Sequence, residues 1–151
     1  MALPPQKFRE IVFQMLFSRN FGTGDEQEII PFLMNELKVT RRSMLEAEVK
    51  VNHILSKQDE IDEKIRPIST EYTFDRISRV EKSVLRLGIY ELLYDESIPP
   101  KVAIAEAIRL CRKFGTPESA HFVNAILDAV YTAPENSIPE SQSAVLCPVE
   151  S

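Results

Sequence analysis

Three basic side chains form the most informative charged pattern in this sequence. Arg79, Lys82 and Arg86 recur at intervals of three and four residues, which places them within about 60° of one another around an α-helix. Such a stripe can follow a nucleic-acid backbone, because each cation can pair with a phosphate group. The same spacing is also typical of a solvated helix face with ion pairs between successive turns. The stripe is therefore a candidate nucleic-acid surface, with the solvated face as the alternative.

Two further features favour RNA as the ligand of this surface. Lys7 and Arg9 offer a second basic position near the N-terminus, and Phe114 and Phe122 flank a turn that contains glycine. An exposed aromatic ring beside basic side chains suits single-stranded RNA, whose unstacked bases lie on such rings. Ordinary packing in the core is the alternative for both rings.

The sequence contains no pattern typical of an enzyme or a metal site. His53 and His121 belong to different expected helices and neither stands beside a nucleophile signature. The acidic run at residues 59–63 is more typical of a solvated helix face than of paired catalytic carboxylates. Cys111 and Cys147 form no CxxC pair and are expected to be free thiols. We therefore expect a binding protein without catalytic residues, bound metal or cofactor.

The composition is that of an ordinary globular chain. It has 151 residues, a formal net charge of -5, 44% hydrophobic residues and 27% charged residues, which fits one domain. All 18 lysines and arginines precede Phe114, so an acidic total can still coexist with a basic face. No apolar run approaches the ~18 residues of a membrane span, and the N-terminal residues lack a signal-peptide layout. We expect a cytoplasmic protein that does not enter a membrane.

Helices are the elements that must hold these side chains in place. Apolar residues recur at three and four positions in several stretches, and only four glycines occur in the chain. The expected helices cover about residues 5–21, 23–37, 41–55, 56–66, 78–93, 100–114 and 117–130. The sequence thus predicts an all-α compact bundle of about seven helices over residues 1–133. Residues 134–151 are polar and aperiodic and are expected to form a disordered acidic tail.

Local signals refine three of these helices. Ser78 and Glu81 have the spacing of a capping box. The helix that follows is apolar around well over half its circumference, which is typical of a central helix. Gly115 is expected in the left-handed conformation at the end of one helix, and Thr116 is expected to cap the next.

Several stretches, in the same order along the chain, resemble the NusB family of bacterial transcription antitermination factors. They are Arg9-Glu10, Gln14-Met-Leu-Phe, RISRVEKSVLRLGIYEL from Arg76, IPPKVAIAEAI from Ile98, Lys113-Phe-Gly and FVNAILD from Phe122. The resemblance covers roughly residues 5–131. It implies two packed helical halves and no catalysis. It also implies binding to the boxA sequence of rRNA leader transcripts.

The resemblance implies protein partners and contact residues as well. The partners would be the small-subunit ribosomal protein NusE and elongating RNA polymerase with other Nus factors, and the outcome would be read-through of terminators in rRNA operons. The RNA set, with Arg79 added from the basic stripe, is Lys7, Arg9, Arg79, Lys82, Arg86, Glu118 and Phe122. The NusE set is Phe17 and Glu81, where an acidic group suits a basic ribosomal protein.

The N-terminal segment departs from the family pattern. The family often has a run of arginines there, whereas this chain has only Lys7 and Arg9. Because each lost phosphate contact lowers affinity, RNA binding is expected to be weak without NusE. Two alternatives stay open: a module that docks NusE without strong RNA binding of its own, and an RNA-recognition domain like those of rRNA cytosine methyltransferases, which this short chain disfavours. A homodimer also stays open.

Overall fold

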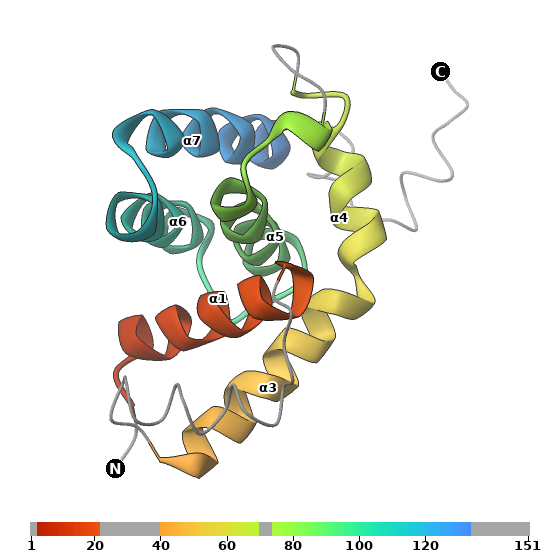
Figure 1. Cartoon of the computed structure of the whole chain (residues 1–151). Helices are drawn as coiled ribbons and strands as arrows, with labels where there is room; N and C mark the ends of the chain where they lie inside the picture. The colour runs from red at the N-terminus through yellow and green to blue at the C-terminus, as the bar shows by residue number, and fades with distance from the viewer. Residues whose placement is uncertain (1–2, 22–39, 70–73, 134–151) are drawn as a thin grey trace, which may run out of the picture.

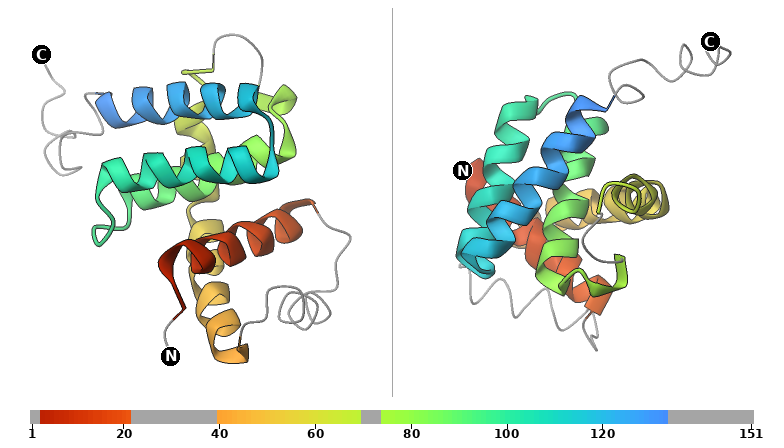
Figure 2. Two further views of the ribbon diagram at one scale, coloured as in Figure 1. Left: turned by 90° about the vertical axis from the view of Figure 1, so that its left-hand side faces the viewer. Right: turned by 90° about the horizontal axis from the view of Figure 1, so that it is seen from above.

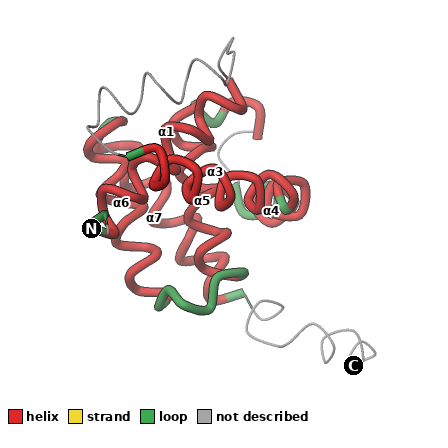
Figure 3. Tube along the Cα trace, turned by 90° about the horizontal axis from the view of Figure 1, so that it is seen from below, coloured by secondary structure: helices red, strands yellow, loops and turns green. Residues whose placement is uncertain are grey.

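The computed structural model describes residues 3–21, 40–69 and 74–133 (Figure 1). The elements in these ranges are α1 (Pro5–Phe21), α3 (Arg41–Ser56), α4 (Gln58–Ile65), the short 3₁₀ helix η1 (Phe74–Arg76), α5 (Arg79–Leu93), α6 (Pro100–Phe114) and α7 (Pro117–Thr132). The described part contains helices and loops but no strand (Figure 3), which confirms the all-α class. The helix expected over 23–37 and the tail expected over 134–151 lie outside the described residues.

Short polar residues begin three of the helices, and the sequence predicts the caps at Ser78 and Thr116. The Thr40 hydroxyl accepts a hydrogen bond from the backbone amide of Ser43, 3.1 Å away. Ser78 and Glu81 form the complete capping box, with both hydrogen bonds at 3.1 Å. The Thr116 hydroxyl accepts from the Ser119 amide at 3.0 Å. Each cap satisfies an amide that has no partner within its helix, so these sequence positions fix where the helices start.

The central helix of the fold is α5, which packs against α1, α4, α6 and α7. Its residues from 83 to 89 are all buried, which confirms the prediction made from its apolar circumference. A Cβ at Gly88 would lie 3.2 Å from the Leu127 side chain, so this glycine lets α5 and α7 approach closely. Helices α5, α6 and α7 form one packed half, and α1 crosses α3 in the other (Figure 2).

The turn between α6 and α7 corrects one prediction. Gly115 has φ -124° and ψ -137°, so it is not in the left-handed conformation. A Cβ at this position would lie 3.0 Å from the Cys111 carbonyl oxygen and 3.3 Å from the Val80 side chain. Glycine is therefore needed here for space, because the start of α5 packs directly against this turn.

None of the described helices combines the length and the apolar character that a membrane span needs.

Substituting Gly115 by alanine tests whether the turn needs this space. The added methyl group would press on a backbone oxygen that cannot rotate away, so the free energy of unfolding should fall by about 1–3 kcal/mol. Urea denaturation followed by circular dichroism measures the change. Asn124→Ala, at an exposed position of α7, is the control for a change of one surface side chain. A Gly115→Ala protein as stable as the parent would contradict the close approach.

Candidate nucleic-acid interface

The first of the predicted RNA-binding arginines, Arg9, lies inside the protein in an ion pair. Its Nε lies 3.1 and 3.0 Å from the two carboxylate oxygens of Glu91, and its Nη1 lies 3.1 Å from Glu106 Oε1. Arg9 is 7% exposed and Glu91 is 1% exposed. Lys50 of α3 donates to the same Glu91 carboxylate at 2.7 Å. The charge of Arg9 is thus balanced within the protein, where it joins α1 to α5 and α6.

Arg86 is held in a similar way between α5 and α4. Its Nε and Nη2 donate to the two oxygens of Asp62, each at 3.0 Å. Arg86 is 6% exposed and Asp62 is 7% exposed. This geometry is the planar two-bond arrangement in which arginine pairs most strongly with a carboxylate. The guanidinium group therefore stabilises the contact between α4 and α5.

Arg79 and Lys82, by contrast, are positioned by aromatic rings. The Arg79 guanidinium carbon lies 5.7 Å from the centre of the Phe21 ring, and Lys82 Nζ lies 4.7 Å from the centre of the Phe74 ring. Neither cation pairs with a carboxylate among the described residues. The face of an aromatic ring attracts a cation without cancelling its net charge. Both cations are consequently held in place with their charge still available to an anion.

Two further basic groups lie over the Phe74 ring beside Lys82. The guanidinium carbon of Arg66 lies 4.5 Å from the centre of this ring, and that of Arg86 lies 5.7 Å from it. Arg66 is exposed and also pairs with Glu63 at 3.0 Å. Its position could not be inferred from helical spacing, because it follows a different helix. We refer to Arg66, Arg76, Arg79 and Lys82, at the corner where α4, η1 and α5 meet, as the α5 basic surface.

The predicted residues of α7 lie near the beginning of that helix. Glu118 is exposed in the first turn, where a carboxylate is favoured by the helix dipole. Phe122 follows four residues later and is partly buried against the core. The first turns of α5 and α7 both contact the Gly115 turn, through Val80 and Ser119. The structure therefore brings the N-terminal ends of α5 and α7 together.

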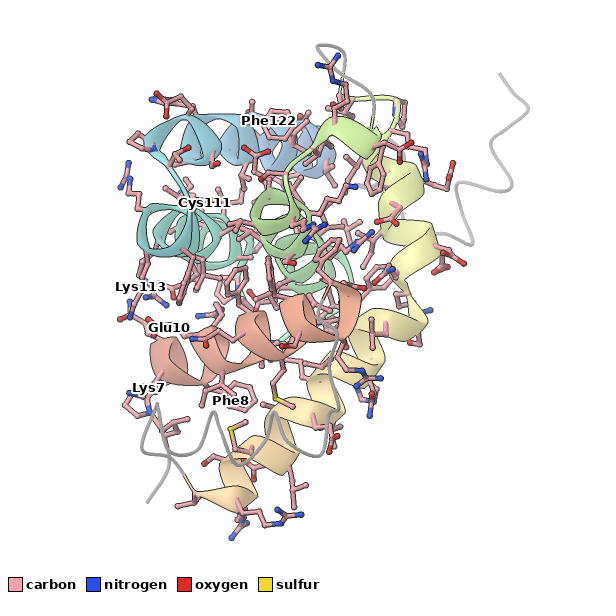
Figure 4. All side chains as sticks on the ribbon, viewed as in Figure 1. Lys7, Phe8, Glu10, Cys111, Lys113 and Phe122 are labelled. Atoms are coloured by element: carbon pink, nitrogen blue, oxygen red, sulfur yellow. The ribbon has the colours of Figure 1, made fainter. Side chains whose placement is uncertain are left out.

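Lys7 lies in a different region of the molecule. It belongs to the first turn of α1, whereas Phe21, beneath Arg79, ends the same helix. The two positions are about 21 Å apart along the helix axis, from a rise of about 1.5 Å per residue. Lys7 lies on the same side of the molecule as Glu10 and Lys113, far from Phe122 (Figure 4). The predicted RNA residues thus occupy two separate regions.

Glu10 organises the region around Lys7. One of its oxygens lies 2.6 Å from Arg109 Nη1 and the other lies 2.9 Å from Lys113 Nζ. Burial alone would raise the pKa of Glu10, but the hydrogen bonds from Lys113 and Arg109 outweigh it, so the pKa lies below its ordinary value. We refer to Lys7, Glu10, Arg109 and Lys113 as the α1–α6 junction.

The two predicted partner-binding residues lie at the end of α1 that faces α5. The Phe17 ring is half-buried, with its centre 6.2 Å from that of Phe13 and 5.5 Å from that of Phe21. Glu81 is 8% exposed and its carboxylate caps α5. Phe21, the neighbour of Phe17, lies beneath Arg79, and Arg79 precedes Glu81 by two residues on α5. The structure therefore places Phe17 and Glu81 at the same end of the bundle.

The described residues offer no reactive or metal-binding group. Cys111 is a buried free cysteine. Burial and the nearby Glu81 carboxylate raise the pKa of its thiol to about 12, so it stays protonated and unreactive. No group of His, Cys, Asp and Glu side chains within the described ranges is arranged to hold a metal ion.

The described residues thus form a helical bundle that presents basic side chains at two places, and the relatives of the chain give its family. The NusB family model matches residues 6–132. The chain is 36% identical over 142 residues to the transcription antitermination protein NusB of Chlamydia pneumoniae, covering 94% of this chain and 88% of that protein. It is 37% identical over 125 residues to the corresponding protein of Geobacter sulfurreducens, covering 81% and 89%.

Solved structures agree with this comparison. T. maritima NusB superimposes with a TM-score of 0.74 and 30% identity, covering 95% of this chain and 99% of that chain. A structure of the antitermination factors NusB and NusE in complex with double-stranded RNA gives a TM-score of 0.72 and 25% identity, covering 85% and 96%. The chain belongs to the NusB family. It is a transcription antitermination factor and not an enzyme, as the sequence predicts.

Substituting Glu91 by glutamine tests the buried ion pair. The change would leave Arg9 and Lys50 without the carboxylate that balances them, so the free energy of unfolding should fall by about 3–5 kcal/mol. Urea denaturation measures this value. The matched control is Glu63→Gln, because the exposed Glu63–Arg66 pair should contribute at most about 1 kcal/mol. Equal losses in the two variants would show that burial adds nothing to the Arg9–Glu91 pair.

The lowered pKa of Glu10 predicts how stability changes with pH. A carboxyl group whose pKa falls on folding contributes stability above its ordinary pKa of 4.5 and loses that contribution as the pH drops through its folded value. Glu10→Gln should therefore be less stable than the parent at pH 7, and the difference should shrink as the pH falls towards 3. Glu96→Gln, which alters an exposed carboxylate in the loop between α5 and α6, is the control. If the free energies of unfolding of Glu10→Gln and the parent differ by the same amount at every pH in this range, the lowered pKa of Glu10 is contradicted.

Proposed function

We propose that this chain binds boxA RNA of rRNA leader transcripts together with NusE and promotes read-through by RNA polymerase. Its membership of the NusB family and its similarity to a NusB solved with NusE and RNA support both partners. In this proposal the protein acts in the cytoplasm, in the elongating polymerase complex with other Nus factors. The observation that carries the RNA part is the pair of cations, Arg79 and Lys82, held on aromatic rings without a carboxylate partner in the described chain.

The physical basis of RNA binding is charge that stays available after folding. Arg79 and Lys82 are already ordered by Phe21 and Phe74, so they lose little conformational entropy when a phosphate group binds. Arg9 and Arg86 are balanced by buried carboxylates, and in this proposal they support the surface instead of contacting RNA. Affinity for the backbone then comes chiefly from the α5 basic surface, with Lys7 as a separate contact.

The α7 residues suit recognition of bases. The exposed Glu118 carboxylate repels phosphate but can accept a hydrogen bond from the amino group of a base such as cytosine. The partly buried Phe122 ring is fixed by the core and can receive a base by stacking. We therefore assign sequence preference to Glu118 and Phe122, and general affinity to the basic residues.

The surface proposed for NusE lies at the C-terminal end of α1. Aromatic rings provide most of its contact area, because Phe17 and Phe21 lie next to each other. The Glu81 carboxylate is mostly covered by its role as a cap. Phe17 should therefore contribute more to NusE binding than Glu81.

One observation favours a second candidate function. With Arg9 and Arg86 balanced inside the protein, fewer cations reach the surface than the sequence predicts. The chain would then dock NusE without strong RNA binding of its own.

Substituting Lys82 by glutamine tests the leading proposal. The complex with NusE should bind boxA RNA more weakly, and the slope of log affinity against log salt should become shallower by about 0.7, the value for one phosphate contact on a single strand. Fluorescence anisotropy over a range of KCl concentrations measures both quantities. The matched control is Lys57→Gln, because Lys57 also lies over an aromatic ring, that of Tyr94 at 5.3 Å.

Each result of this experiment has a defined meaning. An unchanged slope in Lys82→Gln would remove the α5 basic surface from the RNA interface. A parent complex that binds NusE but has no preference for boxA over a scrambled RNA would replace the leading proposal with the docking module.

A further inference from the structure

We propose that Lys113, held by Glu10 beside Lys7, is a second site for a phosphate group of the RNA backbone. The proposal rests on the RNA-binding function proposed above and adds a contact that the sequence patterns do not indicate. The last turn of α6 carries Lys113, and its ammonium group reaches across to α1.

Glu10 positions the ammonium group without using up its capacity to bind. A lysine ammonium has three N–H donors. In the part of the chain that the structure describes, one of them is directed to Glu10 Oε1 at 2.9 Å. The Lys113 side chain is 53% exposed, and its Nζ also lies 5.8 Å from the centre of the Phe114 ring, which leaves its charge uncancelled. A phosphate group can approach the other donors while the contact with Glu10 remains.

The local charge balance favours an anion at this position. At the α1–α6 junction, Arg109 and Lys113 both donate to the Glu10 carboxylate, and Lys7 lies three residues before Glu10 on the same helix. Arg109 also lies 3.0 Å from Glu106, so Glu10 and Glu106 together balance Arg109 and Lys113. The ammonium group of Lys7 is then the positive charge in excess in this region.

Lys113 is the member of the junction best placed to use this charge. The Arg109 side chain is 26% exposed, and its nitrogens already donate to Glu10, Glu106 and the Gln6 carbonyl oxygen. Lys7 lies three residues before Glu10, on the same side of α1. Figure 4 shows Lys7, Glu10 and Lys113 at the same end of α1, with Lys113 on the side of α6.

Substituting Lys113 by glutamine tests the site in the full-length protein bound to NusE. A phosphate contact carries no sequence information, so affinity should fall by the same factor for boxA and for a scrambled RNA. The salt slope should become shallower by about 0.7. Lys113→Arg keeps the charge and should keep the slope of the parent. The matched control is Lys101→Gln, an exposed lysine in the first turn of the same helix, which should change neither quantity.

Two further measurements distinguish a phosphate site from a purely structural role of Lys113. Thermal unfolding of Lys113→Gln should show that the variant is folded. A lysine whose only role is to hold α6 against α1 would change the stability of the protein and leave the salt slope unchanged. An unchanged slope in Lys113→Gln, in a complex whose Lys82→Gln variant does lose affinity, overturns this proposal alone. A parent complex that binds no RNA removes the proposed function and this site with it.

Discussion

The buried ion pair between Arg9 and Glu91 is the interaction on which the arrangement of the helices depends. Glu91 lies on the central helix α5 and is almost completely buried. Its carboxylate receives Arg9 from α1 and Lys50 from α3, so one side chain connects three helices across the two halves. A buried charge without a partner is strongly destabilising. The pair therefore excludes packings in which α1 is rotated or shifted along α5, which apolar contacts alone would penalise less.

The type of group that faces each basic side chain decides what that side chain can do. Carboxylates face Arg9 and Arg86, and those arginines connect helices. Aromatic rings face Arg79 and Lys82, and those cations keep an unbalanced charge. Lys113 is intermediate, since it shares one carboxylate with Arg109 and remains half exposed. Counting basic residues, or the formal net charge, does not distinguish these three cases.

The sequence predicts the helices well because their starts depend on nearby residues. Ser78 with Glu81 and Thr116 with Ser119 are separated by three positions, so spacing alone reveals them. The fate of Arg86 depends on Asp62, 24 positions away, and that of Arg9 depends on Glu91, 82 positions away. The helical spacing of residues in the sequence does not indicate such distant pairs. Spacing therefore places Lys82 and Arg86 on one face of α5, where both lie near Phe74, but cannot show which of them is buried.

The long sequence separation of the α1 contacts has a consequence for synthesis of the chain. Arg9 meets Glu91, and Glu10 meets Lys113, 103 positions later. Helix α1 leaves the ribosome before α5 and α6, the helices that carry its ionic partners. Helix α1 packs against both α3 and α5, so its apolar residues, including Ile11, Val12 and Leu16, which are fully buried in the finished protein, are covered completely only after α5 is made. The order of translation thus makes docking of the first helix a late step in folding, and exposes an apolar surface to aggregation or to chaperones in the meantime.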